Sequence, residues 1–338
     1  MKIIAFFVMI IIICAFPNLT ISGASDGINT CLYTVLPSLF PFFVVSKMLI
    51  FSGGAAFFGR FLHPVMKILF NVSGNGAASF VLGTVSGYPI GAASVCETYK
   101  RGEISKNEAQ NLLGFCNNSG PCFLIGAIGE AMLGSRNLGF ALYIIHILAS
   151  ISVGFLLGRS IKPSKALSKP AQKRKTDIFT SAVEESVISI LNVCGYIVFF
   201  SVVIKFINSV CKSTLVSGFF EMTTAAKNLA ADGSISIDAK IVIISFLCGW
   251  AGLSVNMQTK RFISQTDLSF IKYLYSKLLH ACIAGVFALV YVKIFPHSVS
   301  VMASFQTKIL PGGITNMFLL LTALIFTSYL FKRFLLNK

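Results

Sequence analysis

The chain reads Gly83-Thr84-Val85-Ser86-Gly87-Tyr88-Pro89-Ile90-Gly91 and, further on, Asn117-Asn118-Ser119-Gly120-Pro121, and both polar stretches lie inside sequence apolar enough for a membrane. Proline and glycine interrupt helices and leave backbone N–H and C=O groups without helical partners. Because lipid offers no hydrogen bonds, such a break is stable only where it packs in protein or lines a wet cavity. Breaks of this kind commonly form the solute site of secondary transporters. The two stretches therefore predict a carrier.

The composition indicates a membrane protein rather than a soluble one. Of 338 residues, 55% are hydrophobic and 12% are charged, whereas an average soluble domain has about 25% charged residues. The net charge of +16 comes from basic residues that cluster in short loops, as the positive-inside rule expects, so it does not indicate nucleic-acid binding. We therefore expect an all-α polytopic membrane protein whose partners are the lipid bilayer and a small-molecule solute. The sequence leaves open whether the chain forms a homo-oligomer.

Apolar runs of roughly 20 residues, the length that crosses about 30 Å of hydrocarbon, predict the transmembrane helices. We expect such helices over residues 3–22, 32–52, 138–158, 187–210, 278–296 and 313–331. Discontinuous or hairpin-like segments are expected over 74–96, 117–134 and 240–258, and shorter amphipathic helices over 104–115, 218–230 and 264–275. The N-terminal segment imitates a signal peptide, with Ser22-Gly23-Ala24 as a cut site, but we favour an uncleaved first helix.

A basic loop divides the chain. From Arg159 to Lys175 it contains no acidic residue and seven basic ones, namely Arg159, Lys162, Lys165, Lys169, Lys173, Arg174 and Lys175. Short loops of this kind stay in the cytoplasm, and we expect the same of the basic C-terminal tail. The chain then divides into an N-terminal transmembrane helix (1–28), a first repeat (29–158), the basic cytoplasmic loop (159–178), a second repeat (179–300), and a C-terminal transmembrane helix with a basic tail (301–338).

The two repeats are recognised by matching segments in the same order. At offsets of 155, 162 and 159, the pairs are Phe43-Val44-Val45-Ser46 with Val198-Phe199-Phe200-Ser201, Ser86-Gly87-Tyr88 with Cys248-Gly249-Trp250, and Ile104-Ser105-Lys106-Asn107-Glu108 with Ile263-Ser264-Gln265-Thr266-Asp267. Both members of the last pair carry the Ser-x-x-acid signature of a helix start. Weak internal repeats of this kind are typical of transporter folds, often with discontinuous or re-entrant helices.

The candidate site residues come from the breaks. Two adjacent amides in apolar surroundings are costly unless they are satisfied or used, and a capped half-helix N-terminus suits an anion. We predict that Asn117, Asn118 and Ser119 hold the solute together with Ser86. The full set expected to bind it is Ser86, Gly87, Tyr88, Pro89, Asn117, Asn118, Ser119, Gly120, Trp250, Asn256 and Gln258. The alternatives are plain helix packing for the glycines, a buried cap for the asparagines and an interfacial anchor for Trp250.

Two carboxylates are candidates for coupling transport to a cation or a proton. Glu130 lies in an apolar stretch and Glu97 closes the first break, so each is a functional candidate, with pairing to a lysine as the alternative. The four histidines are isolated in sequence and have no metal-ligand spacing. No catalytic triad order and no nucleotide-binding motif occurs, so the sequence predicts no enzymatic activity, no cofactor and no metal site.

These segments resemble a known family. Leu36-Pro37-Ser38-Leu39-Phe40-Pro41-Phe42-Phe43, Ser86-Gly87-Tyr88-Pro89-Ile90-Gly91-Ala92, Asn117-Asn118-Ser119-Gly120-Pro121 and Gly249 with Ser254-Val255-Asn256-Met257-Gln258 are similar to the YlbJ-type sporulation integral membrane proteins. That family carries the nucleoside-recognition gate domain and is related to concentrative nucleoside transporters, so the resemblance implies two gate-like repeats. One departure is Asn256, where many relatives have a histidine, which puts a role for this position in doubt.

The resemblance also implies a place and a substrate. It implies a bacterial cell membrane, specifically a forespore membrane, and a carrier that moves dipicolinate, the small aromatic dicarboxylate of spores, during sporulation. A cation-coupled nucleoside transporter is one alternative. A membrane scaffold in spore maturation that transports nothing is the other, and in that case the polar breaks would matter only for folding.

Overall fold

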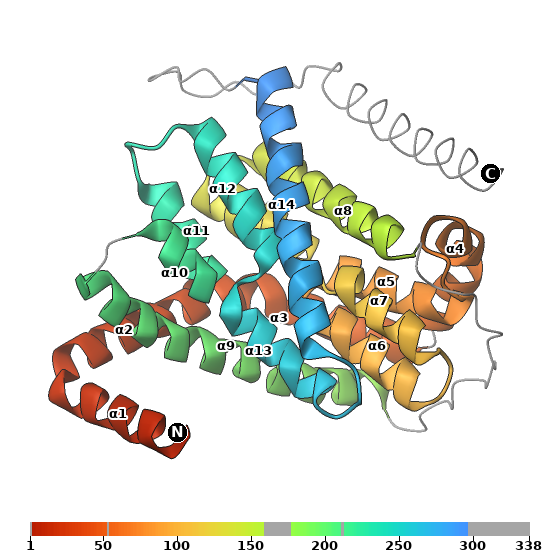
Figure 1. Ribbon diagram of the computed structural model, residues 1–338, viewed down its shortest axis with the longest axis horizontal. Coiled ribbons are helices and arrows are strands. Elements are labelled where there is room, and N and C mark those ends of the chain that lie inside the picture. Colours follow the sequence, from red (N-terminus) through yellow and green to blue (C-terminus); the bar gives the residue numbers. More distant parts are fainter. Residues whose placement is uncertain (1, 53, 159–176, 211–212, 297–338) are drawn as a thin grey trace. The chain divides into compact units, whose positions relative to one another are not determined.

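The structure, a computed structural model, describes residues 2–52, 54–158, 177–210 and 213–296, and every element in these ranges is a helix (Figure 1). Five helices are long and apolar enough to cross a membrane, namely Pro17–Leu49, Arg136–Gly158, Ile178–Val210, Ile237–Ile263 and Phe270–Ile294. A sixth span results if Phe61–Phe70 and Gly74–Ser86, bent by 94°, are counted together. The helix predicted over 313–331, the basic loop and the C-terminal tail lie outside the described residues.

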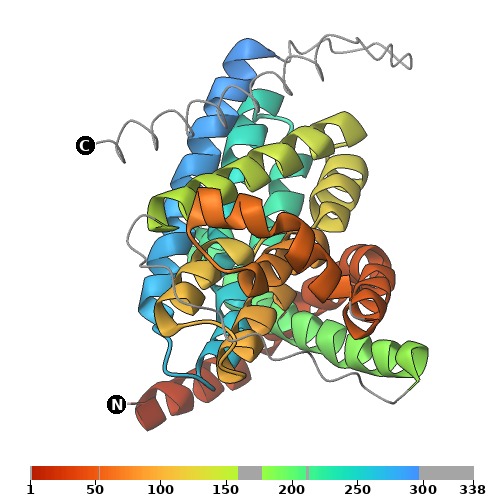
Figure 2. The same cartoon turned by 90° about the vertical axis from the view of Figure 1, so that its right-hand side faces the viewer.

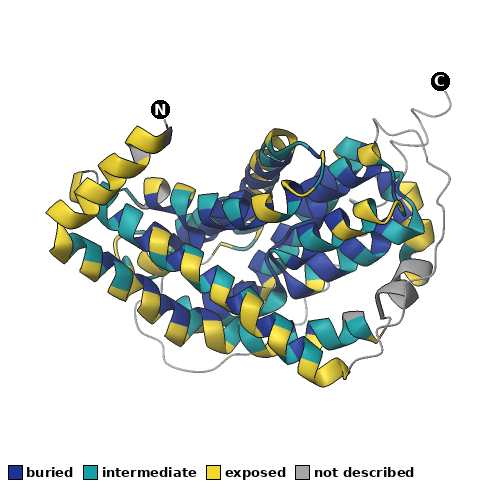
Figure 3. Ribbon diagram, turned by 90° about the horizontal axis from the view of Figure 1, so that it is seen from below, coloured by how far each residue is buried: buried dark blue, intermediate teal, exposed yellow. Residues whose placement is uncertain are grey.

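The N-terminal region differs from the single first helix expected over 3–22. It forms α1 (Lys2–Ala15) and α2 (Pro17–Thr30), separated at Phe16. Pro17 causes the break, because its ring disfavours helical dihedrals in the preceding residue, and Phe16 has φ −125° and ψ 62°. Helix α2 then continues through the π-helical turn η1 (Cys31–Val35) into α3 (Leu36–Phe51). The residues of α1 whose burial is described are all exposed (Figure 3).

The first half contains a hairpin of two short helices. After α4 (Gly54–Phe70), α5 (Gly74–Ser86) and α6 (Ile90–Lys100) pack against each other around the first break. With 13 and 11 residues at about 1.5 Å per residue, they are about 20 and 17 Å long, so neither is long enough to cross a bilayer alone. The elements that follow are α7 (Lys106–Cys116), η2 (Cys122–Met132) and α8 (Arg136–Gly158). The predicted start of α7 is confirmed, since the Ser105 hydroxyl accepts the Glu108 N–H.

The second half has the same order but a different second break. Its elements are α9 (Ile178–Val210), α10 (Thr214–Phe220), α11 (Met222–Ala231), α12 (Ile237–Trp250), α13 (Gly252–Ile263) and α14 (Phe270–Ile294). Helices α12 and α13 meet at Ala251, whose φ is 70°, and together they form one span instead of a hairpin. The discontinuous segment predicted over 240–258 is therefore a broken crossing.

The amphipathic helix predicted over 264–275 is wrong in its first residues. Ser264 ends α13, and the cap of the next helix is Ser269, whose hydroxyl accepts the Lys272 N–H. The carboxylate of Asp267 is used elsewhere: it accepts hydrogen bonds from Lys106 at 2.7 Å and from Tyr99 at 2.8 Å. The Lys106 ammonium beside it, and the Tyr99 hydroxyl, hold the pKa of Asp267 below its usual value.

Hydrogen bonds between the halves join residues at almost the offset that relates the repeats. Tyr88 bonds to Cys248, Lys106 to Asp267, Asn117 to Lys277 and Gln110 to Ser269, with sequence separations between 159 and 161. These bonds therefore hold the first break, α7 and the Asn117 region against α12, α14 and the loop before α14. The long helix α14 runs beside α12 and also packs on α8 and α7, which brings both breaks to its middle (Figures 1 and 2).

Candidate functional site

The first break and the Asn117–Gly120 stretch are in direct contact. Gly87 has φ 76°, and a Cβ placed on it would lie 2.8 Å from the Gly120 nitrogen. Four residues before and after Gly87, the hairpin is equally close to the end of α7. A Cβ on Gly83 would lie 1.6 Å from the Cys116 carbonyl oxygen, and a Cβ on Gly91 would lie 1.9 Å from it. The glycines recurring every four residues therefore let the hairpin close on the backbone that follows α7. These glycines therefore serve helix packing, the alternative role named above, and this packing brings the two breaks together.

A chain of hydroxyl groups links three segments at this contact. The Ser119 hydroxyl donates to the Tyr88 hydroxyl at 3.0 Å, and Tyr88 donates to the Cys248 carbonyl at 2.6 Å. Cys248 lies in the last turn of α12, just before the second break. All three residues are buried. The hairpin, the Asn117–Gly120 stretch and the second break thus meet at one place in the core.

The side-chain N–H groups of the two asparagines donate hydrogen bonds to other groups of the protein. The Asn117 amide donates to Thr259 at 2.9 Å and to Tyr273 at 2.8 Å, and the Asn118 amide donates to the Phe115 carbonyl and to Ser150. The side-chain oxygens of both amides are buried and have no partner among the described residues. The asparagines therefore hold the unwound stretch in place, and only their acceptor oxygens remain available.

A fully buried lysine stands beside this stretch. The Lys277 ammonium donates to the Asn117 carbonyl at 2.9 Å and to His280 Nδ1 at 3.2 Å, and it lies 5.4 Å from the centre of the Tyr88 ring. Within the described ranges no carboxylate forms an ion pair with it. An unpaired buried charge is costly, so such a lysine is a candidate for binding an opposite charge.

Two of the four histidines, isolated in sequence, lie next to each other beside this lysine. The rings of His146 on α8 and His280 on α14 have centroids 4.4 Å apart. His280 Nε2 donates to the His146 carbonyl at 3.0 Å, and the Ser119 N–H donates to His146 Nε2 at 2.9 Å. The two residues are 134 positions apart in sequence and meet because α8 and α14 pack together.

A cavity of about 40 Å³ lies where the segments meet. Of the predicted site residues it is lined by Ser86, Gly87, Tyr88, Gly120 and Gln258, and it is also lined by Ser254, Thr223 and Glu221, which lie outside the predicted set. The hydroxyls of Ser86 and Ser254 and the side-chain nitrogen of Gln258 are buried without partners in the described part of the chain. The space holds about one water molecule, so a larger solute requires the lining segments to move apart.

The lining carboxylate, Glu221, is held by backbone donors. It caps α11 by accepting the N–H groups of Thr223 at 2.8 Å and Thr224 at 2.5 Å. A helix N-terminus stabilises negative charge, so this carboxylate is compensated within the protein. Each carboxylate oxygen can still accept a second hydrogen bond, for example from a hydroxyl group of a solute.

The remaining predicted residues fall into two groups. Trp250 and Asn256 belong to the second break: the Trp250 indole donates to the Phe219 carbonyl at 3.0 Å, and the Asn256 amide donates to the Trp250 carbonyl at 3.1 Å. Glu97 and Glu130 are not brought to the site. Glu97 is exposed and pairs with Arg101 on the same helix, and Glu130 is exposed near the end of η2.

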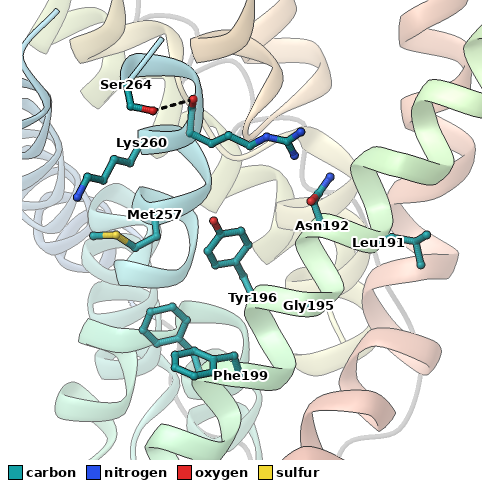
Figure 4. A pocket seen from close by; sticks show the side chains of 10 residues that line it. Leu191, Asn192, Gly195, Tyr196, Phe199, Met257, Lys260 and Ser264 are labelled. Atoms are coloured by element: carbon teal, nitrogen blue, oxygen red, sulfur yellow. Dashed lines mark hydrogen bonds between the residues drawn. The ribbon is translucent and has the colours of Figure 1, made fainter. Parts of the chain in front are cut away.

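A larger groove of about 670 Å³ lies between α9 and α13 (Figure 4). Asn192, Tyr196 and Phe199 line it from α9, and Met257 and Lys260 line it from α13. None of its ten lining residues, all of them described, has a buried polar atom without a partner. The smaller cavity is therefore the better candidate for a solute site, because its unpartnered polar atoms need a ligand or water.

Comparison with solved structures gives the class of protein. The fold is similar to that of the transporter CNTnw, solved as a variant in its intermediate 3 state, with a TM-score of 0.51, 15% identity, and coverage of 80% of this chain and 77% of that one. At this identity the likeness shows the fold alone. Residues 32–136 also match the family described as Gate, nucleoside recognition. The chain thus has the fold of a concentrative nucleoside transporter, and its first half contains the match to the Gate family.

Comparison of sequences gives the family. The chain is 30% identical over 317 residues to the sporulation integral membrane protein YlbJ of Bacillus subtilis strain 168, covering 81% of this chain and 78% of that protein. It belongs to the YlbJ family of sporulation integral membrane proteins.

Proposed function

We propose that this protein carries a small organic anion, dipicolinate, across a forespore membrane during sporulation. The observation that supports it best is the buried Lys277 ammonium at the meeting point of the breaks, which has no ion pair with a described carboxylate. A carboxylate of the solute would supply the missing negative charge. The substrate itself comes from the resemblance to YlbJ-type proteins and from sporulation in the relative's name.

The cavity offers hydrogen-bond donors for the second carboxylate of the same ligand. Ser86 and Ser254 offer hydroxyl donors and Gln258 offers an amide donor, and none of these atoms has a partner among the described residues. A dicarboxylate could bind Lys277 at one end and these donors at the other once the Tyr88 region moves. The flat ring between its carboxylates suits stacking on an aromatic side chain such as Tyr88.

A nucleoside is the second candidate, and one observation favours it. The cavity combines the Glu221 carboxylate with two serine hydroxyls and an amide, a set that suits the hydroxyl groups of a sugar. The fold and the gate-domain match agree with that reading. A neutral nucleoside would, however, leave Lys277 without a counter-charge.

The proposal is tested by uptake into proteoliposomes that contain the purified full chain. We expect uptake of labelled dipicolinate and little uptake of uridine, and we expect an Asn117→Ala/Asn118→Ala double variant to lose uptake. Preference for uridine would favour the nucleoside candidate. If neither solute enters with the wild-type protein although that protein is required for sporulation, the result supports the scaffold alternative.

Gln258→Glu is expected to weaken dipicolinate binding tenfold or more, about 1.4 kcal/mol. The change is nearly isosteric, but it replaces an unpartnered donor by a carboxylate that repels an anion. Binding is measured by calorimetry on the purified protein. Gln265→Glu, the same change at an exposed position, should bind normally. Unchanged affinity in a folded Gln258→Glu variant would remove this residue from the site.

A further inference from the structure

Each histidine of the buried pair has one nitrogen that accepts a hydrogen bond from the region of the breaks. His146 Nε2 accepts the Ser119 N–H at 2.9 Å, and His280 Nδ1 accepts from the Lys277 ammonium at 3.2 Å. A backbone N–H and an ammonium can only donate, so these two nitrogens carry no proton. Both imidazoles are therefore neutral, and their hydrogens lie on His146 Nδ1 and His280 Nε2.

We propose that His146 binds a proton that is transported together with the solute, an inference that rests on the proposed transport function. A proton from water that adds to His146 Nε2 converts the neutral ring to an imidazolium, which donates from both nitrogens and accepts at neither. The Ser119 N–H then has no acceptor. Proton binding and the present position of the Asn117–Gly120 stretch exclude each other, so protonation releases this stretch.

The surroundings of the pair favour His146 over His280 as the acceptor. Lys277 touches His280 directly and disfavours a second positive charge there. The titratable groups bonded to the same unwound stretch are phenols: Tyr88 bonds to Ser119 and to the Cys248 carbonyl, and Tyr273 bonds to Asn117. His146 Nδ1 is buried without a partner among the described residues, so this N–H is free to donate to a ligand.

Within the described core no carboxylate is available to stabilise an imidazolium. The buried acids, Glu108 and Glu221, accept backbone N–H groups of Ser73 and of Thr223 and Thr224. The carboxylate of a bound solute is therefore the group that would stabilise protonated His146. Because such coupling is reciprocal, the proton would strengthen solute binding by the same factor as the solute strengthens proton binding. Proton and anion would then move in the same direction.

The test separates exchange from accumulation in proteoliposomes that contain the full chain. At equal pH on both sides, exchange of labelled against unlabelled dipicolinate reports binding and movement. With an alkaline lumen, the wild-type protein should accumulate dipicolinate about fivefold or more above its equal-pH level. His146→Gln should lose the accumulation, and its exchange rate should no longer depend on pH, because glutamine can accept the Ser119 N–H but cannot take up a proton. His63→Gln, an exposed histidine on α4, is the matched control and should accumulate normally.

The outcomes distinguish the two proposals. If the wild-type protein exchanges dipicolinate but a pH gradient drives no accumulation, the proton inference is wrong and the transport proposal stands. Accumulation by His146→Gln equal to that of the wild-type protein also overturns it. If the wild-type protein does not exchange dipicolinate, the proposed function fails and the coupling inference falls with it.

A measurement on the unmodified protein covers the case in which His146→Gln does not fold. Adding dipicolinate to the wild-type protein in weakly buffered solution near neutral pH should withdraw about one proton per bound solute, read with a pH indicator. Binding without proton uptake would overturn the inference.

Discussion

Lys277→Met is expected to lower dipicolinate uptake about 100-fold or more, a loss of about 2.8 kcal/mol in binding or transport. Methionine keeps most of the side-chain length and its apolar contacts but removes the buried positive charge. Replacing a buried charge by an apolar group of similar volume is often tolerated in stability. The loss should therefore fall on the solute and not on folding, and it is measured as initial uptake by equal amounts of monodisperse protein.

The matched control is Lys272→Met, the same substitution on the same helix at an exposed position. It should transport normally. Uptake of a neutral nucleoside such as uridine should change little in either variant. Normal dipicolinate uptake by Lys277→Met would contradict the anion site.

Gly83→Ala is expected to abolish the folded protein. The added Cβ would lie 1.6 Å from the Cys116 carbonyl oxygen, and this neighbour is backbone that cannot turn away. Overpacking against side chains typically costs about 1–3 kcal/mol, and a collision with backbone at the hairpin contact should exceed that range. The measurement is the fraction of protein that elutes as a monodisperse peak in detergent, together with its thermal midpoint.

Gly195→Ala is the control for helix propensity. A Cβ on Gly195, inside α9, meets nothing within 4 Å, so alanine should be neutral or favourable by up to about 1 kcal/mol. A Gly83→Ala protein with the yield and midpoint of Gly195→Ala would show that the hairpin does not pack as described.

The breaks could be located from the sequence because their cause is local. Pro89 and the glycines around it interrupt a helix wherever it lies, and an Asn-Asn-Ser-Gly-Pro stretch in apolar surroundings requires internal hydrogen bonds. The confirmed Ser105 cap is local for the same reason. By contrast, the Ser264-x-x-Asp267 pattern does not start a helix, because a tertiary contact uses the Asp267 carboxylate. Asp267 pairs with Lys106, and Ser269 caps the following helix instead.

The charged part of the site could not be found by local reasoning. Lys277 and His280 lie three residues apart on one face of an apolar helix, but their partners come from positions 117 and 146. One signal was available, because a lysine inside an apolar span is costly unless it is paired or used. Glu97 and Glu130 were predicted to belong to the site but lie exposed away from it. Apolar neighbours in sequence do not show on which side of its helix a carboxylate lies.

The position of Trp250 gives the protein an intrinsic optical reporter. It is the single tryptophan of the chain, it precedes the second break, and its ring stacks on Phe219 with centroids 5.2 Å apart. Its emission therefore comes from one site and needs no correction for other indoles. Any rearrangement that admits solute between the breaks and disturbs this stack would change the emission wavelength and the quenching of the indole. Equilibrium and stopped-flow fluorescence can thus follow opening of the second break in the unlabelled protein.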